Sequence, residues 1–212
     1  MNNLYYYVQT MNAFEKEEEL TRELLEIIET QENVTQRGLA DKLNVALGLT
    51  NSYLKRCVNK GFIKVKQVPA NRYLYYLTPK GFAEKSRLSA KYLSTSFDFY
   101  RRASESIVTL YNQCLAKGWK RIVLCGESEL AEIAYIRSQE LEIHVLGLWD
   151  QKRYKSEYLG LPVWKKLEDI VAHDACLVTN VSEVANTYDE MKKKISDERI
   201  LIPTVLGFRR PA

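Results

Sequence analysis

The chain has 212 residues, 46% of them hydrophobic, and a net charge of +4, which suits one large or two small globular domains. It has no apolar run of about 18 residues or more, and its first residues, MNNLYYYVQTMNAFEKEEE, lack the basic flank and apolar core of a secretory signal; both observations favour a cytoplasmic protein without membrane spans. The four cysteines form no CxxC pair and the two histidines lack ligand-like partners, so we expect reduced cysteines and no metal site.

The charge is unevenly distributed along the chain. Residues 1–33 contain two basic and eight acidic residues, residues 34–91 contain twelve basic and two acidic ones, and residues 92–212 contain seventeen of each. A basic block of this length indicates a nucleic-acid-binding surface. A solvated basic face without such a partner is the alternative interpretation.

Apolar residues at helical spacing predict three helices, within residues 15–31, 33–45 and 49–61. Thr35 is the expected N-cap of the second helix, and Gly61 is expected to end the third. Residues 44–48 are predicted to form a turn. In the third helix, Tyr53, Leu54, Cys57 and Val58 are expected to face inward, which leaves Asn51, Ser52, Lys55, Arg56 and Asn59 outside.

The hydrophobic period changes to two after Gly61. FIKVKQV and YLYYL are predicted to form two strands joined by the turn PANR, and Thr78 and Pro79 are expected to start another helix. Helix, helix, turn, helix, hairpin, helix is the order of a winged helix-turn-helix domain, an α+β fold.

The stretches VTQRGLADKLNVALGLTNSYLKRCVNKGFIKV and YYLTPKGFA resemble the DNA-binding domain of MarR-type bacterial transcription regulators, over roughly residues 15–90. The resemblance implies binding to double-stranded DNA, with the third helix in the major groove and the wing against the backbone or minor groove. Because the third helix is poor in arginine, specificity is expected to rest on Asn51 and on DNA shape. The DNA contacts that the resemblance implies are Thr35, Gln36, Arg37, Asn51, Ser52, Lys55, Arg56, Lys64, Lys66, Asn71 and Arg72.

A connecting helix is predicted over residues 92–118. Its apolar residues approach a heptad spacing at Leu93, Phe97, Tyr100, Ala103, Ile107, Tyr111 and Cys114. We predict that this helix pairs with its copy in a homodimer, since MarR-like proteins are typically dimers and two-fold symmetry matches paired half-sites. The alternative is a helix that packs only on its own domains.

Strands and helices alternate from residue 119 onward. KRIVLCG, LEIHVLGLWD, ACLVTN and RILIPTVL are predicted strands, and helices are predicted in SELAEIAYIRSQ, LPVWKKLEDIVAH and VSEVANTYDEMKKKIS. This alternation predicts a small α/β domain with a parallel, Rossmann-like sheet in residues 119–212, after a DNA-binding domain in residues 1–91.

Ligands of such sheets lie at the carboxyl ends of the strands. The candidate ligand-binding residues are therefore Gly126, Glu127, Ser128, Asp150, Gln151, Lys152, Thr179 and Asn180. Asp150 lies near the place where an acid holds a ribose hydroxyl. Ser128 replaces the second glycine of a dinucleotide fingerprint, and Glu127 and Glu129 repel phosphate, so a weakened phosphate site is expected.

Two further families resemble this half. The domain order is similar to that of Rex-type redox-sensing repressors, which bind NAD(H). GLWDQKRYKSEYLGLPVWKKLEDI resembles the nucleotide-sugar-binding domain of sugar acetyltransferases of bacterial polysaccharide synthesis, with matches at Gly147, Asp150, Gly160, Pro162 and Val163. These resemblances imply a nucleotide or nucleotide-sugar effector and a link to polysaccharide synthesis.

The expected function is a non-enzymatic transcription regulator that binds double-stranded DNA and responds to a small-molecule effector. The sequence contains no recognisable Ser/His/Asp set, metal cluster or intact cofactor loop. Two alternatives stay open: a nucleotide-sugar-modifying enzyme with an accessory winged helix, and a constitutive DNA-binding scaffold that recruits a protein partner.

Overall fold

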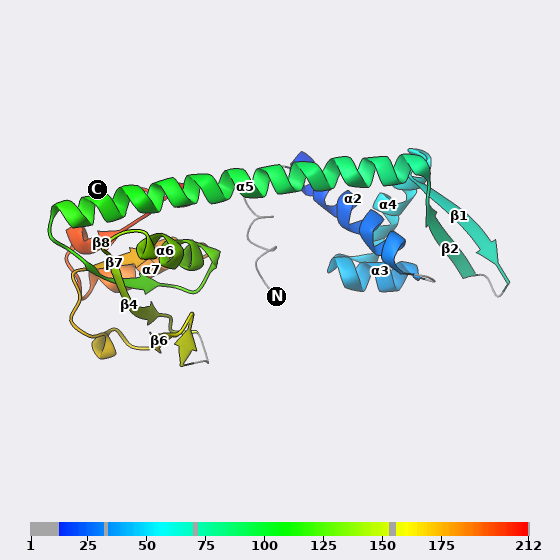
Figure 1. The fold of residues 1–212 in the computed structure, drawn as a ribbon. Coiled ribbons are helices and arrows are strands. Elements are labelled where there is room, and N and C mark those ends of the chain that lie inside the picture. Colours follow the sequence, from blue (N-terminus) through cyan, green and yellow to red (C-terminus); the bar gives the residue numbers. More distant parts are fainter. Residues whose placement is uncertain (1–12, 32–33, 70–71, 153–155, 212) are drawn as a thin grey trace. The chain divides into compact units, whose positions relative to one another are not determined.

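The computed structural model describes residues 13–31, 34–69, 72–152 and 156–211 (Figure 1). These residues form two compact units, one up to Ser96 and one from Phe97 onward. Helix α5 (Pro79–Ala116) contributes its first turns to the first unit and its last turns to the second.

The first unit has the element order that the sequence predicts. It contains α2 (Ala13–Thr30), α3 (Gln36–Leu43), α4 (Leu47–Asn59), β1 (Ile63–Val68), β2 (Arg72–Leu77) and the start of α5. The two strands are antiparallel, with Ile63 opposite Leu77. The core of this unit is formed by Leu24, Leu25, Ile28, Leu39, Leu43, Leu54, Cys57, Phe62 and Ile63.

The expected helix caps are present. The Oγ1 of Thr35 accepts a hydrogen bond from the amide of Gly38 at 3.0 Å, and that of Thr78 accepts one from Gly81 at 3.0 Å. Gly61 has a φ of +75°, which suits the residue after a helix end. The predicted turn over residues 44–48 is too long, because Asn44 ends α3 in the left-handed region and α4 already begins at Leu47.

The helix that starts at Pro79 and the predicted connecting helix are a single element. No glycine or proline occurs between Gly81 and Gly118, so nothing in the sequence interrupts α5. Of the seven heptad positions, Ala103, Ile107, Tyr111 and Cys114 are buried in the core of the second unit. That part of the stripe therefore packs within its own chain.

The second unit is an α/β domain with a six-stranded sheet of order β5-β6-β4-β3-β7-β8. All neighbouring strands are parallel except β5 and β6. The prediction of an α/β domain with a mostly parallel sheet is therefore confirmed. Its elements are β3 (Arg121–Cys125), α6 (Glu129–Gln139), β4 (His144–Trp149), β5 (Glu157–Tyr158), β6 (Leu161–Trp164), η1 (Leu167–Asp169), β7 (Ala175–Val178), α7 (Val184–Lys192), η2 (Asp197–Arg199), β8 (Ile200–Leu201) and η3 (Thr204–Leu206).

Successive residues of the central strands face opposite sides of the sheet. Ile122 and Leu124 contribute to a core shared with α5 and α6, whereas Val123 and Cys125 contribute to a core that contains Tyr188 and Met191 of α7. All four cysteines are free and buried. None of the described helices combines the length and hydrophobicity needed to cross a membrane.

Two predictions for this unit need correction. RILIPTVL, predicted to be a strand, contains only the two-residue strand β8, and its last three residues form the 3-10 helix η3. LPVW forms strand β6, parallel to β4, and the only helical segment in LPVWKKLEDIVAH is the three-residue η1. The pairing depends on Gly147 of β4, because a Cβ there would lie 2.4 Å from the Trp164 ring. Trp164 fills space that a side chain at position 147 would occupy.

Candidate nucleic-acid interface

The outward face of α4 is mixed in character. With 3.6 residues per turn, the residues that project away from the core are Gly48, Leu49, Ser52, Lys55, Arg56 and Asn59, and all of them are exposed. The predicted contacts Ser52, Lys55 and Arg56 thus belong to one surface. Leu49 belongs to it too, although the sequence prediction did not include it.

Asn51, the predicted base reader, is oriented differently from these residues. Its side chain is half-buried, and its Oδ1 is buried without a hydrogen-bond partner among the described residues. It therefore lies at the edge of the exposed face of α4 rather than at its centre.

Lys55 and Arg56 are neighbours in different electrostatic settings. The guanidinium of Arg56 forms an ion pair of 2.8 Å with Glu17 of α2 and lies 5.8 Å from the centre of the Tyr53 ring. Lys55 is exposed and forms no ion pair with any acidic residue that the structure describes. Lys55 is thus the cation of α4 that is available to a phosphate.

The start of α3 carries the predicted phosphate contacts. Thr35 is occupied as the N-cap, and the Nε2 of Gln36 donates a hydrogen bond to the hydroxyl of Tyr75 at 3.2 Å. Arg37 is exposed. The Gln36–Tyr75 contact links the start of α3 to strand β2 of the hairpin.

The hairpin β1–β2 presents both cations and aromatic groups. Lys64 and Lys66 are exposed on β1, where they pair in register with Tyr76 and Leu74. Tyr73 and Tyr76 of β2 are each 47% exposed and extend the predicted surface. Of the other two predicted wing contacts, Asn71 lies outside the described residues, as does the side chain of Arg72, whose backbone belongs to β2.

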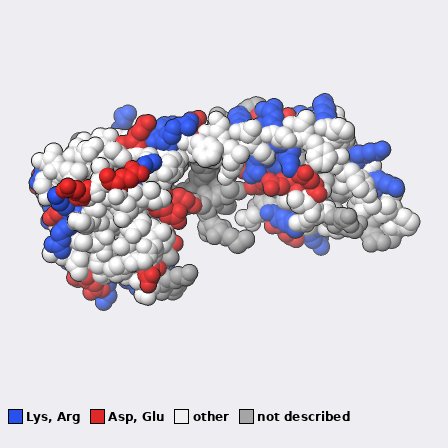
Figure 2. Space-filling model, viewed as in Figure 1, with Lys and Arg blue, Asp and Glu red and all other residues white. Residues whose placement is uncertain are grey.

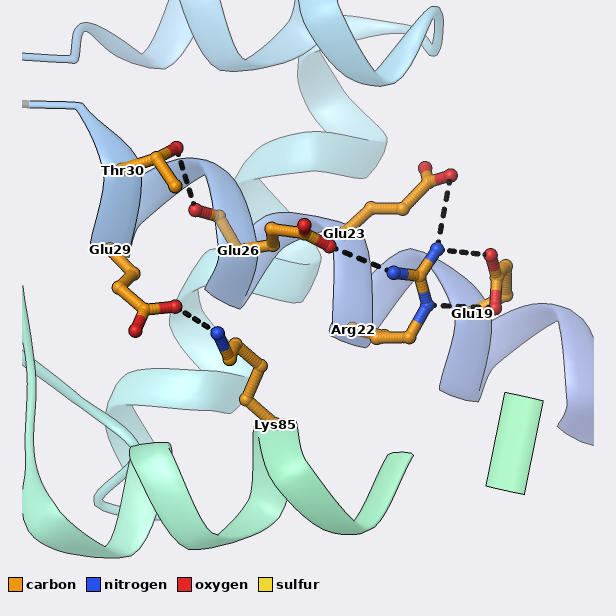
Figure 3. A network of polar contacts seen from close by, with 7 residues as sticks. All are labelled: Glu19, Arg22, Glu23, Glu26, Glu29, Thr30 and Lys85. Atoms are coloured by element: carbon orange, nitrogen blue, oxygen red, sulfur yellow. Dashed lines mark hydrogen bonds and ion pairs between the residues drawn. The ribbon is translucent and has the colours of Figure 1, made fainter. Parts of the chain in front are cut away.

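Part of the basic block is neutralised by α2. Lys85 of α5 pairs with Glu29, and Arg87 and Lys91 pair with Glu18 (Figure 3 shows the first pair). Burial by itself would raise the pKa of Glu18, but the ion pairs with Lys91 and Arg87 outweigh this effect and lower it. These cations of α5 are therefore engaged in holding the domain together.

Arg22 shows how dense the acidic side of α2 is. Its guanidinium contacts Glu19 at 2.6 Å and Glu26 at 2.8 Å, with Glu23 at 3.8 Å (Figure 3). It also lies 4.7 Å from the centre of the Tyr92 ring of α5. Such a surface repels a polyanion, so DNA is not expected to approach along α2.

The remaining cations surround α3, α4 and the hairpin. In this view the wing end of the unit carries basic side chains, and acidic groups gather over α2 (Figure 2). No acidic residue in the described part of the chain forms an ion pair with Arg37, Lys42, Lys55, Lys60, Lys64, Lys66 or Lys80. Ala46 provides no side-chain cap for α4, so its first amides are available to phosphate as well.

The predicted ligand residues of the second unit lie together at the carboxyl ends of β3, β4 and β7. The carboxylate of Asp150 accepts hydrogen bonds from the amides of Glu127 and Lys152, both at 2.9 Å. The predicted ribose-binding side chain thus holds the backbone of the turn after β3. Gln151 and Lys152 are exposed, and the Nζ of Lys152 lies 2.5 Å from the Oε1 of Glu183.

The turn itself is closed by internal contacts. Ser128 is the N-cap of α6, where its Oγ accepts from the amides of Leu130 and Ala131 and donates to the carbonyl of Thr179 at 2.5 Å. The hydroxyl of Thr179 donates to the carbonyl of Gly126 at 2.6 Å. A Cβ on Gly126 would lie 2.3 Å from the Cβ of Asn180, so no side chain fits there. The amides of Glu127, Leu130 and Ala131 are therefore already engaged.

The comparisons with known proteins agree with the first unit. Residues 17–64 match the family model described as winged helix-turn-helix DNA-binding, which spans α2, α3, α4 and the beginning of β1. A search of curated proteins gives no match. The chain therefore has an N-terminal winged helix-turn-helix DNA-binding domain followed by an α/β domain with a mostly parallel sheet.

Proposed function

We propose that the protein is a transcription regulator that binds double-stranded DNA through α3, α4 and the β1–β2 wing. The observation that supports this best is the division of charge within the winged-helix domain. Acidic residues of α2 pair with cations of α5, whereas the cations around α4 and the wing, except Arg56, have no acidic partner among the described residues. In the part of this surface that the structure describes, the one ion pair that a bound polyanion would displace is that of Arg56 with Glu17.

Equilibrium binding of the whole chain to labelled duplexes and to the matching single strands tests the proposal. The logarithm of the duplex affinity should fall linearly with the logarithm of the salt concentration, by about 0.9 per phosphate contacted. Duplexes should bind more tightly than single strands, because a recognition helix needs a groove. Absence of duplex binding at low salt would refute the proposal.

We further propose that the regulator is a homodimer held by the first part of the predicted α5 stripe. Leu93 and Phe97, about one turn apart on α5, are 52% and 59% exposed, whereas the later positions from Ala103 are buried in the core of the second unit. Phe97→Glu should yield a monomer in analytical ultracentrifugation. Ile136→Glu alters a residue of α6 that is 49% exposed, and it should leave the dimer intact. A dimer that survives Phe97→Glu would exclude this contact.

For the α/β domain we propose the role of an effector-binding, non-catalytic module. Each carboxylate oxygen of Asp150 holds one amide, and such oxygens can accept a second hydrogen bond, so a sugar hydroxyl can still be bound. Because the amides of Glu127, Leu130 and Ala131 are engaged, a ligand recognised through hydroxyls, such as a nucleotide sugar, fits better than one held by its pyrophosphate.

Thermal unfolding with UDP-sugars, GDP-sugars and NAD(H) tests this module, since a ligand that binds only the folded state raises the melting temperature. The sugar nucleotides should raise it and NAD(H) should not. The increase should be lost in Asp150→Ala but retained in Asp169→Ala, an exposed residue of η1. No increase with any ligand would favour recruitment of a protein partner, and turnover of a sugar nucleotide would favour an enzyme.

A further inference from the structure

The first turn of α4 has an unusual surface for a charged interface. Leu47 is 40% exposed and Leu49 is 44% exposed, and they flank Gly48. A single exposed leucine is ordinary on a protein surface. Here two leucines occur within one turn. Leu49 belongs to the face that continues with Ser52 and Lys55, whereas Leu47 lies on the other side of Gly48, toward Asn51.

Gly48 is not explained by packing. A Cβ at this position would have no heavy atom within 4 Å, and Gly48 lies in the first turn of α4 without a positive φ, a backbone conformation that alanine adopts without strain and at which it stabilises a fold relative to glycine. The fold would therefore accept alanine at position 48. The missing side chain instead leaves room for another molecule to approach the helix backbone.

The surroundings indicate what that molecule is. The turn is continuous with the surface of Ser52 and Lys55, and it lies inside the segment that matches the winged helix-turn-helix DNA-binding family. In the major groove the apolar group of a base pair is the 5-methyl of thymine, which contacts apolar side chains. The major groove of DNA offers both kinds of partner: exposed leucines can contact thymine methyl groups, and Lys55, which has no acidic partner among the described residues, can contact a phosphate.

We propose that Leu47 and Leu49 read thymine by contacting its 5-methyl group in the major groove, and that Gly48 allows the helix to approach the base edges. This inference rests on the proposed DNA binding and adds the base that is recognised. It assigns specificity to residues other than Asn51, whose Oδ1 is buried. The preferred site should therefore contain thymines at defined positions.

The test uses the full chain and the tightest duplex selected from a pool with a randomised core. Each thymine of that duplex is replaced in turn by deoxyuridine, which removes only the methyl group. At least one replacement should weaken binding about fourfold, the equivalent of ~0.8 kcal/mol for one buried methyl. At that position, Leu47→Ala or Leu49→Ala should bind thymine and deoxyuridine equally, whereas Ser52→Ala should still distinguish them.

Gly48→Ala provides a second test, because it should change stability and DNA binding in opposite directions. It should raise the melting temperature of the winged-helix domain and weaken duplex binding. If duplexes bind but no deoxyuridine replacement matters, or if both leucine variants still distinguish the bases, the inference is wrong and DNA binding itself stands. If no duplex binds at all, the proposed DNA binding itself is wrong, and the inference about thymine is wrong with it.

Discussion

Glu17 of α2 holds the guanidinium of Arg56 at 2.8 Å, and Arg56 belongs to the exposed face of α4 that is proposed to bind DNA. The pair is partly open to solvent, with side-chain exposures of 28% for Glu17 and 50% for Arg56. Partly exposed ion pairs contribute roughly 0–1 kcal/mol to stability, so the fold does not depend on it. The pair matters more for DNA binding, because the carboxylate of Glu17 competes with a DNA phosphate for the guanidinium of Arg56.

Replacing Glu17 with glutamine should therefore strengthen DNA binding. The variant frees Arg56 and removes a negative charge near α4, so duplex affinity should rise and the salt dependence should steepen by up to about one phosphate contact. Fluorescence anisotropy at several salt concentrations measures both. Glu26→Gln makes the same charge change on α2 beside Arg22 and should alter the slope little. Equal effects of the two variants would mean that only net charge matters.

The turn after β3 should tolerate no side chain at Gly126. Gly126 has a φ of +101°, and its missing Cβ would overlap Asn180. Gly126→Ala should cost on the order of 2–5 kcal/mol, from backbone strain together with overpacking. Trp119, Trp149 and Trp164 all lie in the α/β domain, so tryptophan fluorescence during urea unfolding reports on that domain.

Gly160→Ala separates the two causes of this loss. Gly160 also has a positive φ, of +73°, but its missing Cβ would have no heavy atom within 4 Å. This variant should show only the backbone strain, of about 1–2 kcal/mol. If Gly126→Ala were no more destabilising than Gly160→Ala, the close approach of Asn180 would not be limiting.

Asp174 should make the stability of the α/β domain depend on pH. Its Oδ2 accepts hydrogen bonds from the amides of Arg121 at 2.8 Å and Lys120 at 2.9 Å, and the bond from Arg121 is the main reason why the pKa of Asp174 is lowered. A lowered carboxyl pKa stabilises the fold at pH values above the ordinary pKa of 3.8, and this stabilisation is lost as the pH falls through the pKa of the folded state.

Asp174→Asn should accordingly lower the urea midpoint at neutral pH, and the difference from the native chain should shrink as the pH falls below 3.8. Tryptophan fluorescence again gives the midpoint. A difference that stayed constant down to the lowest pH would show that Asp174 acts through packing and not through its charge.

The sequence predicted the elements better than the orientation of individual side chains. Thr35, Thr78 and Gly61 are local signals, and each has the role expected from its position. Leu47 and Gly48 were assigned to a turn because glycine usually interrupts helices, whereas α4 includes both. Strand β6 was missed because its pairing depends on the distant Gly147, which no local pattern contains.

The candidate sites show the same limit. The spacing of Asp150 from Gly126 suits an acid that binds a ribose, and it suits equally an acid that holds the turn after β3. Only the structure shows that the carboxylate of Asp150 accepts hydrogen bonds from the amides of Glu127 and Lys152 and so holds that turn. The basic block of residues 34–91 was visible in the sequence. Its division into the cations paired by Glu18 and Glu29 and those left around α4 depends on how α2 packs, which composition does not contain.

The salt dependence of duplex binding for the native chain, Lys55→Ala and Lys85→Ala tests the central claim most directly. Both variants remove one positive charge from the same domain, but Lys55 has no acidic partner among the described residues, whereas Lys85 is paired with Glu29. Lys55→Ala should weaken binding and reduce the salt slope by about 0.9, and Lys85→Ala should leave the slope unchanged. Equal slopes in all three proteins would contradict the assignment of α4 as the DNA-binding helix.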